Sequence, residues 1–213
     1  MLKLYDYFRS SASFRVRIAL NLKGLDYQAI PIHLLNNGGE QFSDAYQKIN
    51  PQCLVPALQE GNTILTQSLA IIEYLEDCHP SPALFTDNPY TNALIRSFAL
   101  TIAADIHPLN NLRVIKYLTS EFNISDEQKT RWYHHWMAKG FSALEKQLNT
   151  HQLSGLYCFG NQPTLADICL IPQMYNARRF ALDLNPYPAL VNIDKNCQKL
   201  AAFTDAFPVE TAT

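Results

Sequence analysis

The stretch MLKLYDYFRSSASFRVRIALNLKG, residues 1–24, changes its hydrophobic pattern part of the way along. Residues 1–8 are rich in leucine and aromatic side chains, which favours a strand. From Ser11 onward apolar residues recur on one helix face. These residues are Phe14, Ile18 and Leu22. Gly24 is typical of a helix C-terminus. The stretch therefore predicts a strand that leads directly into a helix.

The alternation of short strands and helices continues to about residue 80. The predicted strands are residues 27–32, 55–59 and 63–66, and the predicted helices are residues 42–48 and 67–78. Glu60-Gly61-Asn62 is typical of the turn in a hairpin. The order βαβ followed by ββα predicts a small mixed sheet with helices packed on it.

A proline-rich segment at residues 79–89 divides the chain, because it can continue neither a helix nor a strand. The pattern beyond it is helical almost throughout. One apolar stripe comprises Leu94, Phe98, Ile102, Ile106 and Leu109. We expect two domains: an α/β domain over residues 1–80 and an all-helical domain over residues 89–213.

Two capping boxes are predicted in the helical part. Ser125-x-x-Gln128 and Thr164-x-x-Asp167 each place an acidic or amide side chain three residues after a hydroxyl residue. We expect each to open a helix, the second running to about Phe180. Thr164 and Asp167 are interpreted as helix-nucleating residues with no contact to a substrate.

Composition and charge narrow the possible partners. The 213 residues are 47% hydrophobic and 17% charged, with a net charge of −2 and no basic run. Nucleic acid and membranes are therefore not expected as partners. No signal peptide and no long apolar stretch is present, so the expected location is the cytoplasm.

The five cysteines are widely spaced and form no C-x-x-C pair. An odd count with such spacing argues for a reducing compartment and against a disulfide framework. The six histidines form no i,i+4 pair, so no metal site is predicted.

The serines of residues 9–17 stand where the first strand gives way to the helix. Their simplest interpretation is N-capping, because a serine oxygen satisfies an amide of the first turn. The functional interpretation is that a serine hydroxyl and the helix N-terminus together hold an anion or a thiolate.

Two later segments allow a similar pair of interpretations. Pro56 stands at the start of a predicted strand. It is either an ordinary proline of an edge strand or part of a cis Val55–Pro56 bond. A cis bond would turn the Val55 backbone outward toward a peptide-like ligand. Ser68 at the start of a helix is either a cap or a carboxylate ligand.

The order and spacing of these segments resemble the zeta class of the glutathione transferases, over nearly the whole chain. The most specific part is Ser-Ser-x-Ser-x-Arg-Val-Arg-Ile-Ala-Leu at residues 10–20. Further matches are Asn50-Pro51 with Val55-Pro56, Gln67-Ser68, residues 105–113 and residues 176–180. The resemblance implies the glutathione transferase fold: a thioredoxin-like α/β domain followed by an all-α domain, usually as a homodimer.

The resemblance also implies roles for individual residues. Ser10 and Ser11 would be catalytic and lie against the glutathione sulfur, with Ser10 the better candidate for stabilising the thiolate. The other residues implied to bind glutathione are Gln41, Val55, Gln67, Ser68, His107, Asn111 and Arg113. Arg179 and Arg9 would bind the substrate's carboxylates. Ala12 stands where the family often has cysteine, and His107 stands where some members have glutamine.

The implied reaction is a cis-trans isomerisation of a small dicarboxylic keto-acid, maleylacetoacetate, to fumarylacetoacetate. The thiolate of glutathione, the cofactor, would add to the double bond, which then rotates before glutathione is expelled unchanged. Three alternatives remain: the same chemistry on maleylpyruvate, conjugation of glutathione to α-halo acids, and a glutathione-binding protein without enzymatic activity.

Overall fold

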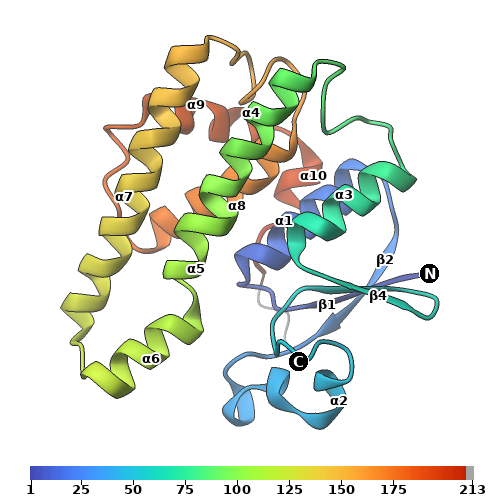
Figure 1. Cartoon of the computed structure of the whole chain (residues 1–213), viewed down its shortest axis with the longest axis vertical. Helices are drawn as coiled ribbons and strands as arrows, with labels where there is room; N and C mark the ends of the chain where they lie inside the picture. Colours follow the sequence, from blue (N-terminus) through green and yellow to red (C-terminus); the bar gives the residue numbers. More distant parts are fainter. Residues whose placement is uncertain (210–213) are drawn as a thin grey trace. The chain divides into compact units, whose positions relative to one another are not determined.

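The structure is a computed structural model and describes residues 1–209 (Figure 1). The chain divides into two units. One comprises Met1–Ala83 together with the chain from Leu200, and the other comprises Leu84–Lys199. The sequence placed the final segment in the helical domain, whereas the structure places it with the first unit. Its contacts explain this: Phe207 packs edge-on against Phe14 at 5.3 Å between ring centroids, and Asn21 Nδ2 donates to the Ala202 carbonyl at 3.1 Å.

The first unit is built on a mixed sheet of four strands. They are β1 (Leu2–Asp6), β2 (Tyr27–Pro31), β3 (Ala57–Glu60) and β4 (Thr63–Thr66). The strand order is β2-β1-β3-β4, with β1 parallel to β2 and the other two pairs antiparallel. The predicted hairpin turn joins β3 to β4, and Gly61 there has a φ of +57°. The thioredoxin-like expectation is thus confirmed.

Helices cover both faces of this sheet. The helical elements of the first unit are α1 (Ser11–Leu22), η1 (Asn36–Gly38), η2 (Glu40–Phe42), α2 (Asp44–Gln47), α3 (Ser68–Cys78) and α10 (Ala201–Thr204). Figure 1 shows α1 and α3 on one face and α2 on the other. One face of α3, formed by Ser68, Ile71, Ile72 and Leu75, is buried. The predicted helix at residues 42–48 is shorter, because Ser43 caps α2 by accepting the Tyr46 amide at 3.3 Å.

The second unit is all helical. Its elements are α4 (Pro89–Leu100), the π-helical segment η3 (Thr101–Ile106), α5 (His107–Leu109), α6 (Leu112–Phe122), α7 (Asp126–His151), α8 (Leu165–Arg179) and α9 (Pro188–Cys197). Helix α8 is mostly buried and contacts both α4 and α9. The predicted apolar stripe is correct for Phe98 and for two isoleucines of η3, but Ile95 and not Leu94 lies in the core.

The two predicted capping boxes are present at Ser125 and Thr164. Ser125 opens α7. Its amide donates to Gln128 Oε1, and its Oγ accepts from the Gln128 amide. Helix α8 ends at Arg179, with Phe180 as its C-cap. None of the helices within residues 1–209 is long and apolar enough to cross a membrane.

Candidate functional site

Ser10 ends a tight turn between β1 and α1. Its amide donates to the Tyr7 carbonyl at 2.8 Å, and its Oγ accepts the Ser13 amide at 3.2 Å. The capping interpretation of Ser10 is therefore confirmed. A hydroxyl that accepts one bond still has its own hydrogen to donate. Ser10 is half-buried at a helix N-terminus, so this hydrogen can stabilise an anion, including a thiolate.

The two residues after Ser10 complete the first turn of α1. Ser11 is the first helical residue and is buried, whereas Ala12 is partly exposed. No acidic residue lies in this first turn, so nothing there opposes a bound negative charge.

The segment before β3 presents backbone from Val55. The Val55–Pro56 peptide bond is cis, as the second interpretation of this proline required. Tyr46 Oη and Asn50 Nδ2 both donate to the preceding Leu54 carbonyl at 2.7 Å. Burial raises the pKa of Tyr46, so its hydroxyl stays protonated as a donor. Within residues 1–209 the Val55 amide and carbonyl make no backbone hydrogen bond, and they can pair with a peptide-like ligand.

The start of α3 differs from the capping interpretation. Ser68 is the first residue of the helix, and Gln67, with a φ of +70°, occupies the N-cap position without a side-chain cap bond. The Ser68 hydroxyl instead accepts from Arg15 Nη1 at 3.2 Å, inside the unit. The amides of the first turn and the Ser68 hydroxyl hydrogen are thus suited to a carboxylate. Gln67 is exposed and donates from Nε2 to Gln52 Oε1 at 2.9 Å.

Gln41 is buried although its side chain is polar. Only 5% of its surface is exposed, and within residues 1–209 its Oε1 has no hydrogen-bond partner. A buried amide oxygen without a donor is costly, so such groups usually have a partner. An N–H group of a bound peptide is a donor of the required kind.

Three predicted glutathione residues lie in the second unit, at the junction of α5 and α6. Asn111 is the N-cap of α6, and its Oδ1 accepts the Arg113 amide at 3.0 Å. The Arg113 side chain is exposed, and His107, the first residue of α5, is partly exposed. The six other predicted glutathione residues belong to the first unit.

The two predicted carboxylate-binding arginines each lie beside an aromatic ring. The Arg9 guanidinium carbon is 4.9 Å from the centroid of Phe8, and that of Arg179 is 5.1 Å from the centroid of Phe180. Phe180 is stacked on Tyr133 at 3.9 Å between centroids. Burial raises the pKa of Tyr133, and the Arg179 charge opposes this rise. Arg179 is exposed at the end of α8, where it can bind an anion.

Sequence reasoning assigned no role to Arg15, which contacts Ser68 from α1. Arg15 is only 2% exposed and lies among apolar residues of its helix. A charged residue within an apolar helical run was the available signal, because long charged side chains are seldom fully buried without a partner. The partner itself, 53 residues away, could not be read from the local pattern.

Known proteins match this chain over nearly its full length. Residues 9–78 match the family model "Glutathione S-transferase, N-terminal domain". The chain is 48% identical to a probable maleylacetoacetate isomerase of Vibrio cholerae over 96% of this chain and 94% of that protein.

Two solved structures are similar over nearly their full length. One is the holo structure of a maleyl pyruvate isomerase described as a bacterial zeta-class glutathione S-transferase. It has a TM-score of 0.95 and 43% identity, and the match covers 98% of each chain. The other is a maleylacetoacetate isomerase of Methylobacterium extorquens with bound malonate and glutathione. It has a TM-score of 0.94 and 36% identity, and covers 99% of this chain and 98% of that one. The fold, the site elements and this identity lead to one assignment: the chain belongs to the zeta class of the glutathione transferases.

Proposed function

We propose that the protein isomerises maleylacetoacetate to fumarylacetoacetate with glutathione as its cofactor. The observation that carries this proposal is Ser10, a half-buried hydroxyl at the N-terminus of α1 with its hydrogen available to a thiolate. The printed names of relatives that match over nearly the full length support the same reaction.

The residues of the first unit fit a bound tripeptide. The carbonyl and amide of Val55 can pair with its central residue, and the N-terminus of α3 with Ser68 can take its γ-glutamyl carboxylate. The buried Gln41 oxygen needs a donor that a peptide supplies. Gln67, exposed beside Ser68, completes the polar surroundings of that carboxylate. When bound, glutathione supplies the nucleophilic sulfur that adds to the cis double bond and is released after rotation.

Ser10 and the helix N-terminus are sufficient to favour the thiolate. A free thiol has a pKa of about 8.5, and lowering it by about two units requires roughly 2.7 kcal/mol. A hydrogen bond to a charged group contributes about 1.5–3 kcal/mol. A helix N-terminus contributes about 0.3–1 kcal/mol. Ser10 therefore carries most of the stabilisation, and Ser11 lines the same first turn.

The substrate carries a carboxylate at each end, and arginine is the residue suited to grip one. A guanidinium bonds a carboxylate through two parallel N–H groups and fixes its orientation. Arg179 is exposed for this role, whereas its neighbour Arg178 is paired with Asp194. We assign Arg179 to one carboxylate of the substrate and Arg9 to the other.

Three residues of the helical unit are also assigned to glutathione. His107, Asn111 and Arg113 surround the start of α6, where Asn111 already caps the helix. Replacing Arg113 by glutamine, and measuring the KM for glutathione, tests whether this group contributes.

Maleylpyruvate is the second candidate substrate, because a maleyl pyruvate isomerase structure matches at a TM-score of 0.95. The same residues would serve it, since the two compounds share the maleyl group and its carboxylate. Comparing kcat/KM on the two substrates separates them.

The test mixes the purified protein with maleylacetoacetate, with and without glutathione, and follows both isomerisation and free thiol. Isomerisation that requires glutathione and leaves the thiol concentration unchanged supports the proposal. Thiol loss with an α-halo acid, without isomerisation, would show a conjugating transferase instead. Ser10→Ala should lower kcat far more than glutathione affinity. Ser13→Ala is the matched control, because the buried Ser13 Oγ has no hydrogen-bond partner within residues 1–209.

We also propose a homodimer in the cytoplasm. The five cysteines are free, including three that are buried, as a reducing compartment allows. Light scattering of the purified protein tests the dimer, because a monomeric mass at micromolar concentration would contradict it.

A further inference from the structure

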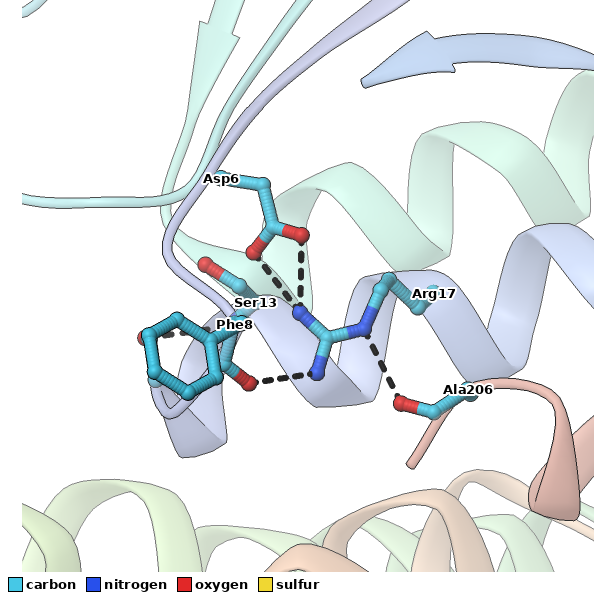
Figure 2. A network of polar contacts seen from close by, with 6 residues as sticks. Asp6, Phe8, Ser13, Arg17 and Ala206 are labelled. Atoms are coloured by element: carbon cyan, nitrogen blue, oxygen red, sulfur yellow. Dashed lines mark hydrogen bonds and ion pairs between the residues drawn. The ribbon is translucent and has the colours of Figure 1, made fainter. Parts of the chain in front are cut away.

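A single arginine of α1 is bonded to three separate segments of the first unit (Figure 2). Arg17 Nη1 donates to both carboxylate oxygens of Asp6, at 2.7 and 2.8 Å. Its Nη2 donates to the Phe8 carbonyl at 3.0 Å, and its Nε donates to the Ala206 carbonyl at 3.0 Å. The side chains of Arg17 and Asp6 are 9% and 11% exposed. The guanidinium thus joins the end of β1, the turn after it and the chain beyond α10.

The bond to Phe8 matters because of where that residue stands. Phe8 lies within the turn that begins at Tyr7 and ends at Ser10, whose amide bonds the Tyr7 carbonyl. Asp6 fixes the residue before the turn, and Arg17 fixes both Asp6 and the carbonyl inside the turn. The Arg17 guanidinium therefore helps to fix the turn that carries Ser10, in addition to the bonds that Ser10 itself makes with Tyr7 and Ser13.

We propose that Arg17 is a positioning residue that sets how well Ser10 stabilises the thiolate of bound glutathione. The inference rests on the proposed function of Ser10. The hydrogen bonds of Arg17 go to Asp6, Phe8 and Ala206, and the carboxylate of Asp6 offsets its charge, so the proposed effect is one of geometry. A misplacement of about 1 Å in a reacting group is enough to reduce a rate substantially.

Lysine keeps the charge of Arg17 but cannot reproduce its forked bonds. An ammonium on a flexible chain has no planar set of N–H groups that reaches three acceptors in fixed directions. In Arg17→Lys the turn loses a defined contact to Phe8, while the pair with Asp6 can re-form. Such a substitution isolates the geometry of the turn from the charge of the network.

Asn21 offers a matched control on the same helix. Its Nδ2 donates to the Ala202 carbonyl, so Asn21 also holds the segment after Leu200 against α1. This hydrogen bond does not involve the turn between Tyr7 and Ser10. Asn21→Ala loosens that segment and leaves the Arg17 contact to Phe8 in place. Asp6→Asn is a second variant on the network, because it weakens the pair that orients Arg17.

The experiment measures the pKa of the thiol of bound glutathione by its ultraviolet thiolate absorbance as a function of pH, using full-length protein. In Arg17→Lys we expect this pKa to rise by about one unit, which lowers the ratio of thiolate to thiol about tenfold at a given pH. Asp6→Asn should also raise the pKa of this thiol. Asn21→Ala should leave the pKa unchanged even if its thermal stability falls.

Two outcomes overturn the inference. One is a thiol pKa equal to the wild-type value in both Arg17→Lys and Asp6→Asn while both are folded. The other is a rise of the thiol pKa in Asn21→Ala as large as the rise in Arg17→Lys. Failure of the proposed function gives a different result, since the wild-type protein would then not lower the pKa of the glutathione thiol at all. Circular dichroism confirms that each variant is folded before its thiol is titrated.

Discussion

Replacing Asp167 by alanine should destabilise the helical unit strongly. The carboxylate of Asp167 is fully buried and accepts from the Cys158 amide at 2.8 Å, the Thr164 amide at 2.8 Å and the Thr164 hydroxyl at 3.0 Å. It therefore holds the loop that precedes α8 against the first turn of that helix. Alanine offers none of these acceptors.

The expected loss follows from the two amides left without a partner. Each buried donor that loses its acceptor costs about 1–3 kcal/mol. Two such amides, at Cys158 and Thr164, give a loss of about 4 kcal/mol in the free energy of unfolding. Total stabilities are about 5–15 kcal/mol, so the variant should be only marginally folded.

Asp167→Asn adds a test of pH dependence. Burial raises the pKa of Asp167 above its ordinary value, against the opposing effect of the donors that bond it. A carboxyl group with a raised pKa holds its proton more tightly when folded than when unfolded. This contribution to stability is complete below the unfolded pKa of about 3.9, and is lost as pH rises through the folded pKa. Asparagine does not titrate. The free energy of unfolding of the native chain should therefore exceed that of Asp167→Asn by more at pH 4 than at pH 8.

The assay is urea unfolding followed by tryptophan fluorescence. Both tryptophans, Trp132 and Trp136, lie on α7, so the signal reports the helical unit. Asp183→Asn is the control, because Asp183 caps an exposed turn by accepting the Asn185 amide. A loss below about 1 kcal/mol in Asp167→Ala would refute the hydrogen-bond reasoning. A stability difference for Asp167→Asn that grows with pH would refute the direction of the pKa change.

Three other substitutions test the glutathione site and the helical core. Ser68→Ala should raise the KM for glutathione about tenfold with little change in kcat, because it removes uniform binding to a carboxylate; an unchanged KM would contradict that role. Gly39→Ala should weaken glutathione binding about tenfold in calorimetry, because Gly39 has a φ of +114° and its new Cβ would lie 2.6 Å from Gln41 Nε2. Gly140→Ala should lower the free energy of unfolding by about 1–3 kcal/mol in urea titrations, because the added Cβ would lie 2.2 Å from Ile106 Cδ1; unchanged stability would show that Ile106 repacks freely.

Local signals predicted the parts of the fold that depend on neighbouring residues. The change of period at Ser11 placed the start of α1 correctly, and the hydroxyl and acidic or amide pairs placed the starts of α7 and α8. The hairpin at Gly61 followed from turn chemistry. Each of these features is determined within about four residues, which is the range over which caps and turns act.

Features that depend on distant residues were not predictable in the same way. The segment after Leu200 belongs with the first unit because Asn21 and Arg17 bond its carbonyls, and no local pattern reveals those partners. Ser68 was predicted to be either a cap or a carboxylate ligand, and the bond that its hydroxyl accepts from Arg15 of another helix could not be predicted. The candidate site residues were assigned through family resemblance and stay a prediction, whereas the contacts that each makes required the structure.

The division of the first unit between two distant stretches of sequence affects how the protein is made. Residues 84–199 emerge from the ribosome after the sheet and before the segment that bonds Arg17. At about 5–20 residues per second, this delay is on the order of ten seconds. Until that segment has been made, Arg17 lacks one of the three acceptors that it has in the folded protein. Arg17 therefore gains the Ala206 carbonyl as an acceptor only after the helical unit has been translated.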